Sequence, residues 1–464
     1  MNEDGGLIRR VDWRELIPWL ILGRVFGVAT RLPVLLLALL TATTAPLGWR
    51  LSEILFLDQN QQLAMGSVLA ERNALPGVRS GHELPLKPSQ MARKAVGYID
   101  VAGASTLRPA LAFARYANDL TSLAYFAFGC LWTLIVFGIG GGAITRIAVV
   151  QLGREERVGV RSAVAFATKR LTALVGAPLM PLGAVAFFTF LTLLVGLGTR
   201  LGEPGVAVAG VMWIFSAIGG SMSVVLLIGV VFGWPLMTAT ICAERSGDSF
   251  EAISRAYAYI FQRPFRVIFY VVIACLIGGV GWVLVDAFAE AVIYICFWNA
   301  DWGDAGNTVM DWRVGVESAT NSGLNDGFGT AAITATVYFV RGLADAYHYS
   351  FFWASAAAIY LLLRRDVDEA EMEEVFVEGE ENAYGLPPVV QDDAQIPHVD
   401  QEQLNETPAD QAATETDPAD QSDSAGDDQS TANEPGESRE ENPEASDAPA
   451  DEPPTEPDDD GRES

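Results

Sequence analysis

The sequence predicts an all-α integral membrane helical bundle of about six transmembrane helices, with cytoplasmic amphipathic elbow helices and a disordered acidic C-terminal tail. Six long apolar stretches lie between Arg31 and Arg365, and a helix needs about 20 apolar residues to cross the hydrocarbon core of a bilayer. After Arg365 the composition changes abruptly, because Asp and Glu dominate from there to the end of the chain. These observations separate a membrane body from an appended tail.

The formal net charge of -28 describes the tail and not the body. Residues 366–464 hold 34 of the 58 acidic residues but only two of the 30 basic residues, so the body carries a slight positive excess. The acidic balance therefore gives no indication of a nucleic-acid partner. The four cysteines lie in apolar stretches without Cys-x-x-Cys spacing or flanking histidines, so neither a metal site nor a cofactor is predicted.

Uncharged runs define five spans, and a run interrupted by charged residues defines a sixth. The approximate spans are 32–49, 120–145, 171–198, 212–241, 265–288 and 342–363. They form a membrane domain over 32–365, with outer loops at 50–119 and 299–329. The uncharged run over 204–243 is long enough for two short crossings around Gly219 and Gly220, but one span is preferred there because it keeps the asymmetry of basic residues.

Basic residues gather before the first span and in the connections between spans two and three and between spans four and five. Short segments with such an excess of Lys and Arg stay on the cytoplasmic side. Both termini are therefore predicted to be cytoplasmic. Residues 1–31 are predicted to form a cytoplasmic interfacial helix with Trp13 and Trp19 at headgroup depth, and an ordinary cytoplasmic lead-in is the alternative.

The connections between spans two and three and between spans four and five resemble each other. When they are aligned, Ala163 and Phe166 of the first meet Ala256 and Tyr259 of the second. Each pattern predicts a short amphipathic helix, an elbow, that leads directly into a span. We expect the elbows either to lie in the cytoplasmic interface or to pack on neighbouring spans. In the first case, anionic lipid headgroups would contact Lys169, Arg170, Arg263 and Arg266.

The second elbow carries two further signals. Asp248 and Glu251 have the spacing of a helix-capping pair. Phe250, Ile253, Tyr257 and Ile260 form one apolar stripe at helical spacing.

Three segments carry a resemblance to known proteins, and they read DWRELIPWL, SFEAISRAYAYIFQRP and AIYLLLRRDVDEAEMEEV. Together they resemble an uncharacterised family of bacterial polytopic membrane proteins, over most of the body but not the outer loop or the tail. The second segment alone is faintly similar to membrane domains attached to glycerophosphodiester phosphodiesterases, but nothing in the chain matches the His and Glu motifs of their catalytic domain. The resemblance implies the topology and a place in the bacterial cytoplasmic (inner) membrane, and it implies no activity.

Charged residues within spans cost about 2.5–3.5 kcal/mol near the bilayer centre, so they are the first candidates for a site. Spans five and six contain a candidate polar cluster of Asp286, Glu290, Arg341, Asp345 and His348. Helix rise places the residues of span five and those of span six at the same depth, about 30 Å from the cytoplasmic surface of the membrane. Arg341 is therefore expected to pair with Asp286 or Glu290. The cluster is interpreted either as a polar entrance or proton-coupled site in which His348 titrates, or as a solvated clasp between helices.

Segments outside the spans carry weaker signals. The outer loop 50–119 contains helix-compatible pieces at about 54–69 and 110–125. The tail cannot bury enough apolar surface to offset the entropy of ordering it. One island in the tail, 384–398, keeps apolar residues and is interpreted as a docking peptide or as solvated linker.

The sequence contains no assembled catalytic or nucleotide motif, which disfavours an enzyme, and an enzyme acting on a lipid ranks third. The first hypothesis is a non-enzymatic membrane scaffold or assembly factor, with the lipid bilayer and a cytoplasmic protein at the acidic tail as partners. The alternative is a transporter of a small solute or lipid, with a polar site between spans five and six. A continuous polar path would favour transport, and spans one to four carry no charge to build one.

Overall fold

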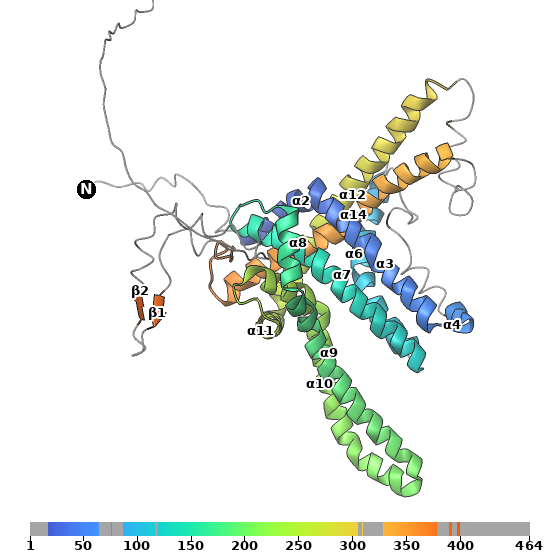
Figure 1. The fold of residues 1–464 in the computed structure, drawn as a ribbon, viewed down its shortest axis with the longest axis vertical. Helices are drawn as coiled ribbons and strands as arrows, with labels where there is room; N and C mark the ends of the chain where they lie inside the picture. The colour runs from blue at the N-terminus through green and yellow to red at the C-terminus, as the bar shows by residue number, and fades with distance from the viewer. Residues whose placement is uncertain are drawn as a thin grey trace, which may run out of the picture. The chain divides into compact units, whose positions relative to one another are not determined.

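A computed structural model describes residues 17–64, 76, 87–116, 119–304, 309, 328–377, 389–391 and 397–399. The chain divides into two compact units, Met1–Glu381 and Asn382–Ser464. The first unit contains all the described helices (Figure 1). The predictions for residues 1–16, for most of the loop 299–329 and for most of the tail concern residues outside this description.

The first unit begins with η1 (Pro18–Leu20), α2 (Ile21–Ala29), α3 (Leu32–Phe56), α4 (Gln59–Ala64) and α6 (Pro88–Tyr116). It continues with α7 (Leu120–Gly153), α8 (Val160–Lys169), α9 (Leu171–Gly198), η2 (Thr199–Leu201) and α10 (Glu203–Ala243). The last helices are α11 (Ser249–Gln262), α12 (Pro264–Asp301) and α14 (Phe328–Val367).

Five of the described helices are long and apolar enough to cross a membrane: α3, α7, α9 with η2, α10 and α12. This agrees with an all-α membrane bundle. Helix α10 runs through Gly219 and Gly220 without interruption, so the run between Pro204 and Ala243 is one helix. Helix α14 is 40 residues long, but it carries Arg341 and Asp345 and is less apolar than these five.

The long helices lie side by side in pairs, α3 with α7, α9 with α10 and α12 with α14 (Figure 1). Helices α9 and α10 form a hairpin that turns at Gly202, whose φ of 79° favours glycine because it has no Cβ. Helix α14 also packs on α2, α3, α7 and α10. Its second half is buried on nearly every side, as expected for a helix that is apolar all round. It therefore forms the centre of the core.

The two elbows are α8 and α11, and the structure supports their alignment. Ala163 and Ala256 have no exposed surface, and Phe166 and Tyr259 are 2% and 1% exposed. The apolar stripe of α11 divides into two parts. Ile260 is 7% exposed and lies near Gly233 of α10, whereas Phe250 is 77% exposed.

The start of α11 is capped as predicted. The side chain of Asp248 accepts a hydrogen bond from the backbone N–H of Glu251 at 2.7 Å. Such a cap satisfies one of the N–H groups that a helix leaves without an internal partner, and it stabilises the helix by about 1 kcal/mol.

Helix α2 packs differently from an interfacial helix. Its apolar residues Leu22, Val25 and Val28 are at most 1% exposed, and the helix lies against α7, α12 and α14. The hydroxyl of Ser350 donates to the carbonyl of Ala29 at 3.0 Å. The apolar face of α2 is therefore covered by protein rather than by acyl chains.

The outer loop 50–119 contains a longer helix than the sequence pattern predicted. Helix α4 (Gln59–Ala64) lies within the predicted piece around 54–69, but α6 covers Pro88–Tyr116 and so begins well before the predicted piece around 110–125. Helix α6 packs on α12, and a Cβ added to Gly279 would lie 2.7 Å from the carbonyl oxygen of Ala95. The two backbones therefore approach closely at this glycine.

Glycines in α7 allow a similar close approach to α14. A Cβ added to Gly141 would lie 2.4 Å from the indole of Trp353, whereas nothing lies within 4 Å of a Cβ added to Gly220. We expect Gly141→Ala to lower the free energy of unfolding by about 1–3 kcal/mol, because the buried indole must move. Thermal unfolding in detergent micelles measures this effect. The matched control Gly220→Ala should be neutral or slightly stabilising, since alanine favours helix more than glycine, and equal losses in both variants would contradict the packing explanation.

The second unit contains one described element pair. Strands β1 (Val389–Gln391) and β2 (Pro397–Val399) are antiparallel, with Val390 opposite His398. They lie in the apolar island of the tail and were not predicted. A single two-stranded pair is at best marginally stable by itself.

Candidate functional site

The five residues of the candidate polar cluster lie on α12 and α14, as predicted. The side chain of Arg341 binds Glu290 through two contacts, from Nε to Oε1 at 2.7 Å and from Nη2 to Oε2 at 3.1 Å. Their side chains are 14% and 10% exposed. Of the two partners considered for Arg341, the structure therefore selects Glu290, in a bidentate pair that fixes both geometry and distance.

Asp286 is fully buried and forms an ion pair with Lys94 of α6. Lys94 was not among the predicted site residues, because it was assigned to an outer loop. The sequence did contain one signal for an additional cation, because the cluster in spans five and six has three carboxylates and only one arginine. Buried charges need partners of opposite sign, so a further cation from another segment was required.

The ring of His348 lies between two aromatic side chains. It stacks on Tyr98 at a centroid distance of 5.2 Å and lies 4.1 Å from the ring of Trp282. Its Nδ1 is 3.1 Å from the backbone carbonyl of Asp345, one turn earlier in α14. These contacts place His348 in an aromatic contact between α6, α12 and α14.

A second polar cluster lies near the C-terminal end of α14, beside the elbow α11. We call it the Glu244 cluster, and it consists of Glu244, Arg255, Tyr360 and Arg364. Oε1 of Glu244 accepts from Arg255 at 3.0 Å and from the Tyr360 hydroxyl at 2.7 Å, and Nε of Arg364 lies 3.1 Å away. One carboxylate thus joins α10, α11 and α14.

The residues that follow α14 extend this cluster. Asp368 accepts from the Tyr259 hydroxyl at 2.5 Å and lies 3.4 Å from Arg255. Burial raises the pKa of Tyr259, and the hydrogen bond to Asp368 raises it further, so the phenol stays protonated and keeps donating. The backbone N–H of Phe376 donates to the carbonyl of Ala243 at 3.0 Å. Residues 366–377 are therefore held against the ends of α10 and α11.

The four predicted headgroup contacts divide into two kinds. Arg170 donates to the carbonyls of Ile241, Glu244 and Arg245 at 2.8–2.9 Å. It therefore caps the C-terminal end of α10, where cations are favoured. Arg266 pairs with Asp366 at 2.5 Å. Lys169 and Arg263 are exposed.

Arg146 was expected in a connection but lies within α7, which continues to Gly153. It is 4% exposed, donates to the carbonyl of Cys242 at 2.7 Å and lies 4.3 Å from the ring of Phe166. The positive charge is therefore stabilised by the carbonyl end of α10 and by an aromatic face.

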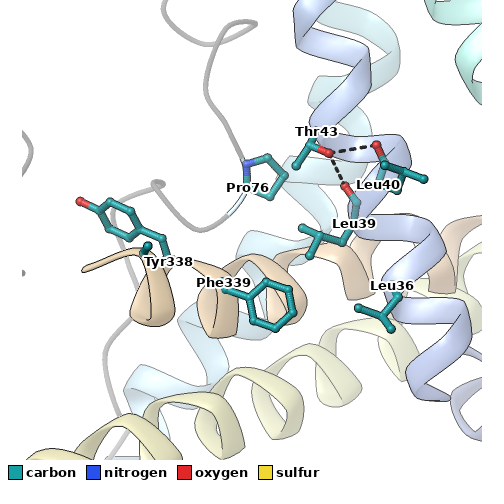
Figure 2. A pocket seen from close by; sticks show the side chains of 8 residues that line it. Leu36, Leu39, Leu40, Thr43, Pro76, Tyr338 and Phe339 are labelled. Carbon is teal, nitrogen blue, oxygen red and sulfur yellow. Dashed lines mark hydrogen bonds between the residues drawn. The ribbon is translucent and has the colours of Figure 1, made fainter. Parts of the chain in front are cut away.

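A shallow groove of about 470 Å³ lies between α3 and α14. Figure 2 shows Leu36, Leu39 and Leu40 of α3 and Phe339 of α14 along it. The hydroxyl of Thr43 bonds to carbonyls of its own helix at 2.9 and 3.0 Å. The groove therefore offers apolar contacts rather than converging polar groups, unlike most sites for polar ligands.

Within the described ranges, no group of three or more His, Cys, Asp or Glu side chains is arranged to hold a metal ion. The five long apolar helices fit a multi-pass membrane protein. No family model, curated protein or solved structure matches the chain.

Proposed function

We propose that the protein is a non-enzymatic scaffold in the bacterial cytoplasmic membrane. The observation that carries this proposal is that buried charges in the bundle are paired with one another. Asp286 pairs with Lys94, and Glu290 pairs with Arg341, so the pairs join helices instead of leaving the charges to line a path. Charges that conduct a solute must exchange with it, whereas charges in a clasp stay paired.

The topology of the proposed scaffold has six spans, with α14 as the sixth and both termini cytoplasmic. In this arrangement the elbows α8 and α11 lie on the cytoplasmic side, in agreement with the excess of Lys and Arg in their connections. The acidic tail then extends into the cytoplasm, where anionic lipids repel it and a protein partner can bind it.

A small-solute or lipid transporter is the second candidate, and one observation favours it. Asp286, Glu290 and Asp345 are all at most 9% exposed, a concentration of buried carboxylates that is rare in membrane helices. In that case the pairs with Lys94 and Arg341 would open during transport.

Labelling of single cysteines in intact cells tests both topology and function. In a variant with alanine at the four native cysteine positions, we expect Thr199→Cys to react from the outside and Ser246→Cys only after permeabilisation. Ala289→Cys, beside the ion pairs, should resist a water-soluble maleimide because its side chain is 6% exposed.

The outcomes separate the two candidates. Outside labelling at Ser246 would contradict the six-span topology. Rapid labelling at Ala289 would show a water-filled path and replace the scaffold with the transporter, provided that a lipid-facing position such as Leu284, which is 58% exposed in the structure, stays unreactive.

A further inference from the structure

The junction between α2 and α3 lies beside the segment that joins α7 to α8. Both glutamates of this segment are already neutralised. Glu155 pairs with Arg24 at 3.0 Å, and Glu156 pairs with Arg154 at 3.2 Å. Among the described residues, no ion pair joins Arg31, Arg157 or Arg161 to a carboxylate.

We call Arg31, Gln151 and Arg157 the Arg31 cluster. Arg31 donates to the amide oxygen of Gln151, and the amide NH₂ of Gln151 is itself a donor. Partial burial lowers the pKa of Arg31, and the positive charge of Arg157 lowers it further. In the described part of the chain, Arg157 and Arg161 form no ion pair. The cluster therefore has an excess of positive charge and several N–H donors.

An apolar stripe continues directly from this cluster along α3. Leu32, Leu36 and Leu40 recur every four residues, so they share one face, and they are 58%, 42% and 63% exposed. Leu36 and Leu40 also line the groove between α3 and α14 (Figure 2). By helix rise, Leu40 lies about 14 Å further into the membrane than Arg31. The positive cluster and the apolar stripe thus lie in the same order as the phosphate and the acyl chain of a phospholipid.

We propose that the Arg31 cluster binds the phosphate of an anionic phospholipid, and that an acyl chain of the same lipid lies along Leu32, Leu36 and Leu40. Arginine forms bidentate contacts with phosphate oxygens, and it binds them better than a lysine does in a partly buried setting. The site requires only that α3 crosses the membrane, and it holds whether the protein is a scaffold or a transporter. It is separate from the elbow residues Lys169 and Arg263.

Retention of lipid by the purified full-length protein tests the site. The protein is mixed in detergent with phosphatidylglycerol or with phosphatidylcholine, and native mass spectrometry measures the bound lipid. We expect the wild type to retain phosphatidylglycerol selectively, and Arg157→Gln to weaken its retention by about five-fold, the loss expected for one arginine near an anionic surface. Arg200→Gln is the matched control, since it removes one exposed positive charge at the far end of α9 and should change nothing.

Three results would overturn the proposal. Equal retention by Arg157→Gln and Arg200→Gln would show that only general surface charge attracts the lipid. Equal retention of both lipids by the wild type would exclude a site selective for an anionic phospholipid, because both lipids carry a phosphate and only phosphatidylglycerol carries a net negative charge. If inorganic phosphate alone raises the temperature of unfolding as much as phosphatidylglycerol does, the site binds free phosphate instead. Arg31→Gln is a second variant of the cluster. If it does not fold, Arg157→Gln still tests the proposal, because Arg157 is exposed and its replacement should leave the fold intact.

Discussion

Replacing Glu244 with glutamine should lower the free energy of unfolding by about 3 kcal/mol, the loss typical of a broken buried ion pair. Oε1 of Glu244 is the contact shared by Arg255, Tyr360 and Arg364. The side chain of Arg364 is 9% exposed, so its charge would remain buried without the carboxylate. Thermal or denaturant unfolding in detergent micelles measures the loss. It should be accompanied by loosening of α11 from α10 and α14.

Two controls distinguish this effect from a general sensitivity to charge. Glu156→Gln removes an equally charged residue from a pair whose glutamate side chain is 53% exposed, and it should cost less than 1 kcal/mol. The double variant Glu244→Leu with Arg364→Met should recover part of the loss, because both buried charges disappear together. If Glu244→Gln is as stable as Glu156→Gln, the cluster does not hold the three helices together.

Replacing Lys94 with methionine should have an effect of similar size, about 3 kcal/mol, because the charge of Asp286 would stay fully buried without its lysine. The expected structural result is the release of α6 from α12. Hydrogen–deuterium exchange of the α6 backbone reports on this contact. Exchange should be slow when Lys94 is present and faster in Lys94→Met.

A double-mutant cycle separates the ion pair from the packing around it. Asp286→Leu combined with Lys94→Met should be more stable than Lys94→Met alone, and the coupling free energy should be about 1–3 kcal/mol. Additive losses in the double variant would show that Lys94 stabilises the bundle through its hydrocarbon chain. Unchanged hydrogen–deuterium exchange of α6 in Lys94→Met would show that α6 is held by its other contacts.

The predictable part of the fold follows from local patterns. Long uncharged runs correspond to α3, α7, α9, α10 and α12, because span length is set by bilayer thickness. The equivalence of Ala163 with Ala256 was visible as a short repeat, and the cap at Asp248 as a spacing of three residues. Each of these signals is contained in a short stretch of sequence, and the repeat compares two such stretches.

The polar site was only half predictable. Helix rise placed Arg341 level with both Asp286 and Glu290, but depth alone does not tell which carboxylate faces the arginine. The choice of Glu290 depends on how α12 and α14 are rotated about their axes, and packing sets this rotation. The role of α6 was missed because its polar residues resemble those of a solvated helix until Lys94 meets a buried aspartate.

The sequence by itself determined the class of protein, the long apolar helices and the location of the charged residues along them, since composition and periodicity act locally. Only the tertiary structure decided which charges meet. Lys94 and Asp286 are 192 positions apart, and Glu244 collects partners from α11 and α14. Such pairs form because burial makes an unpaired charge costly, and packing alone determines which side chains are buried together.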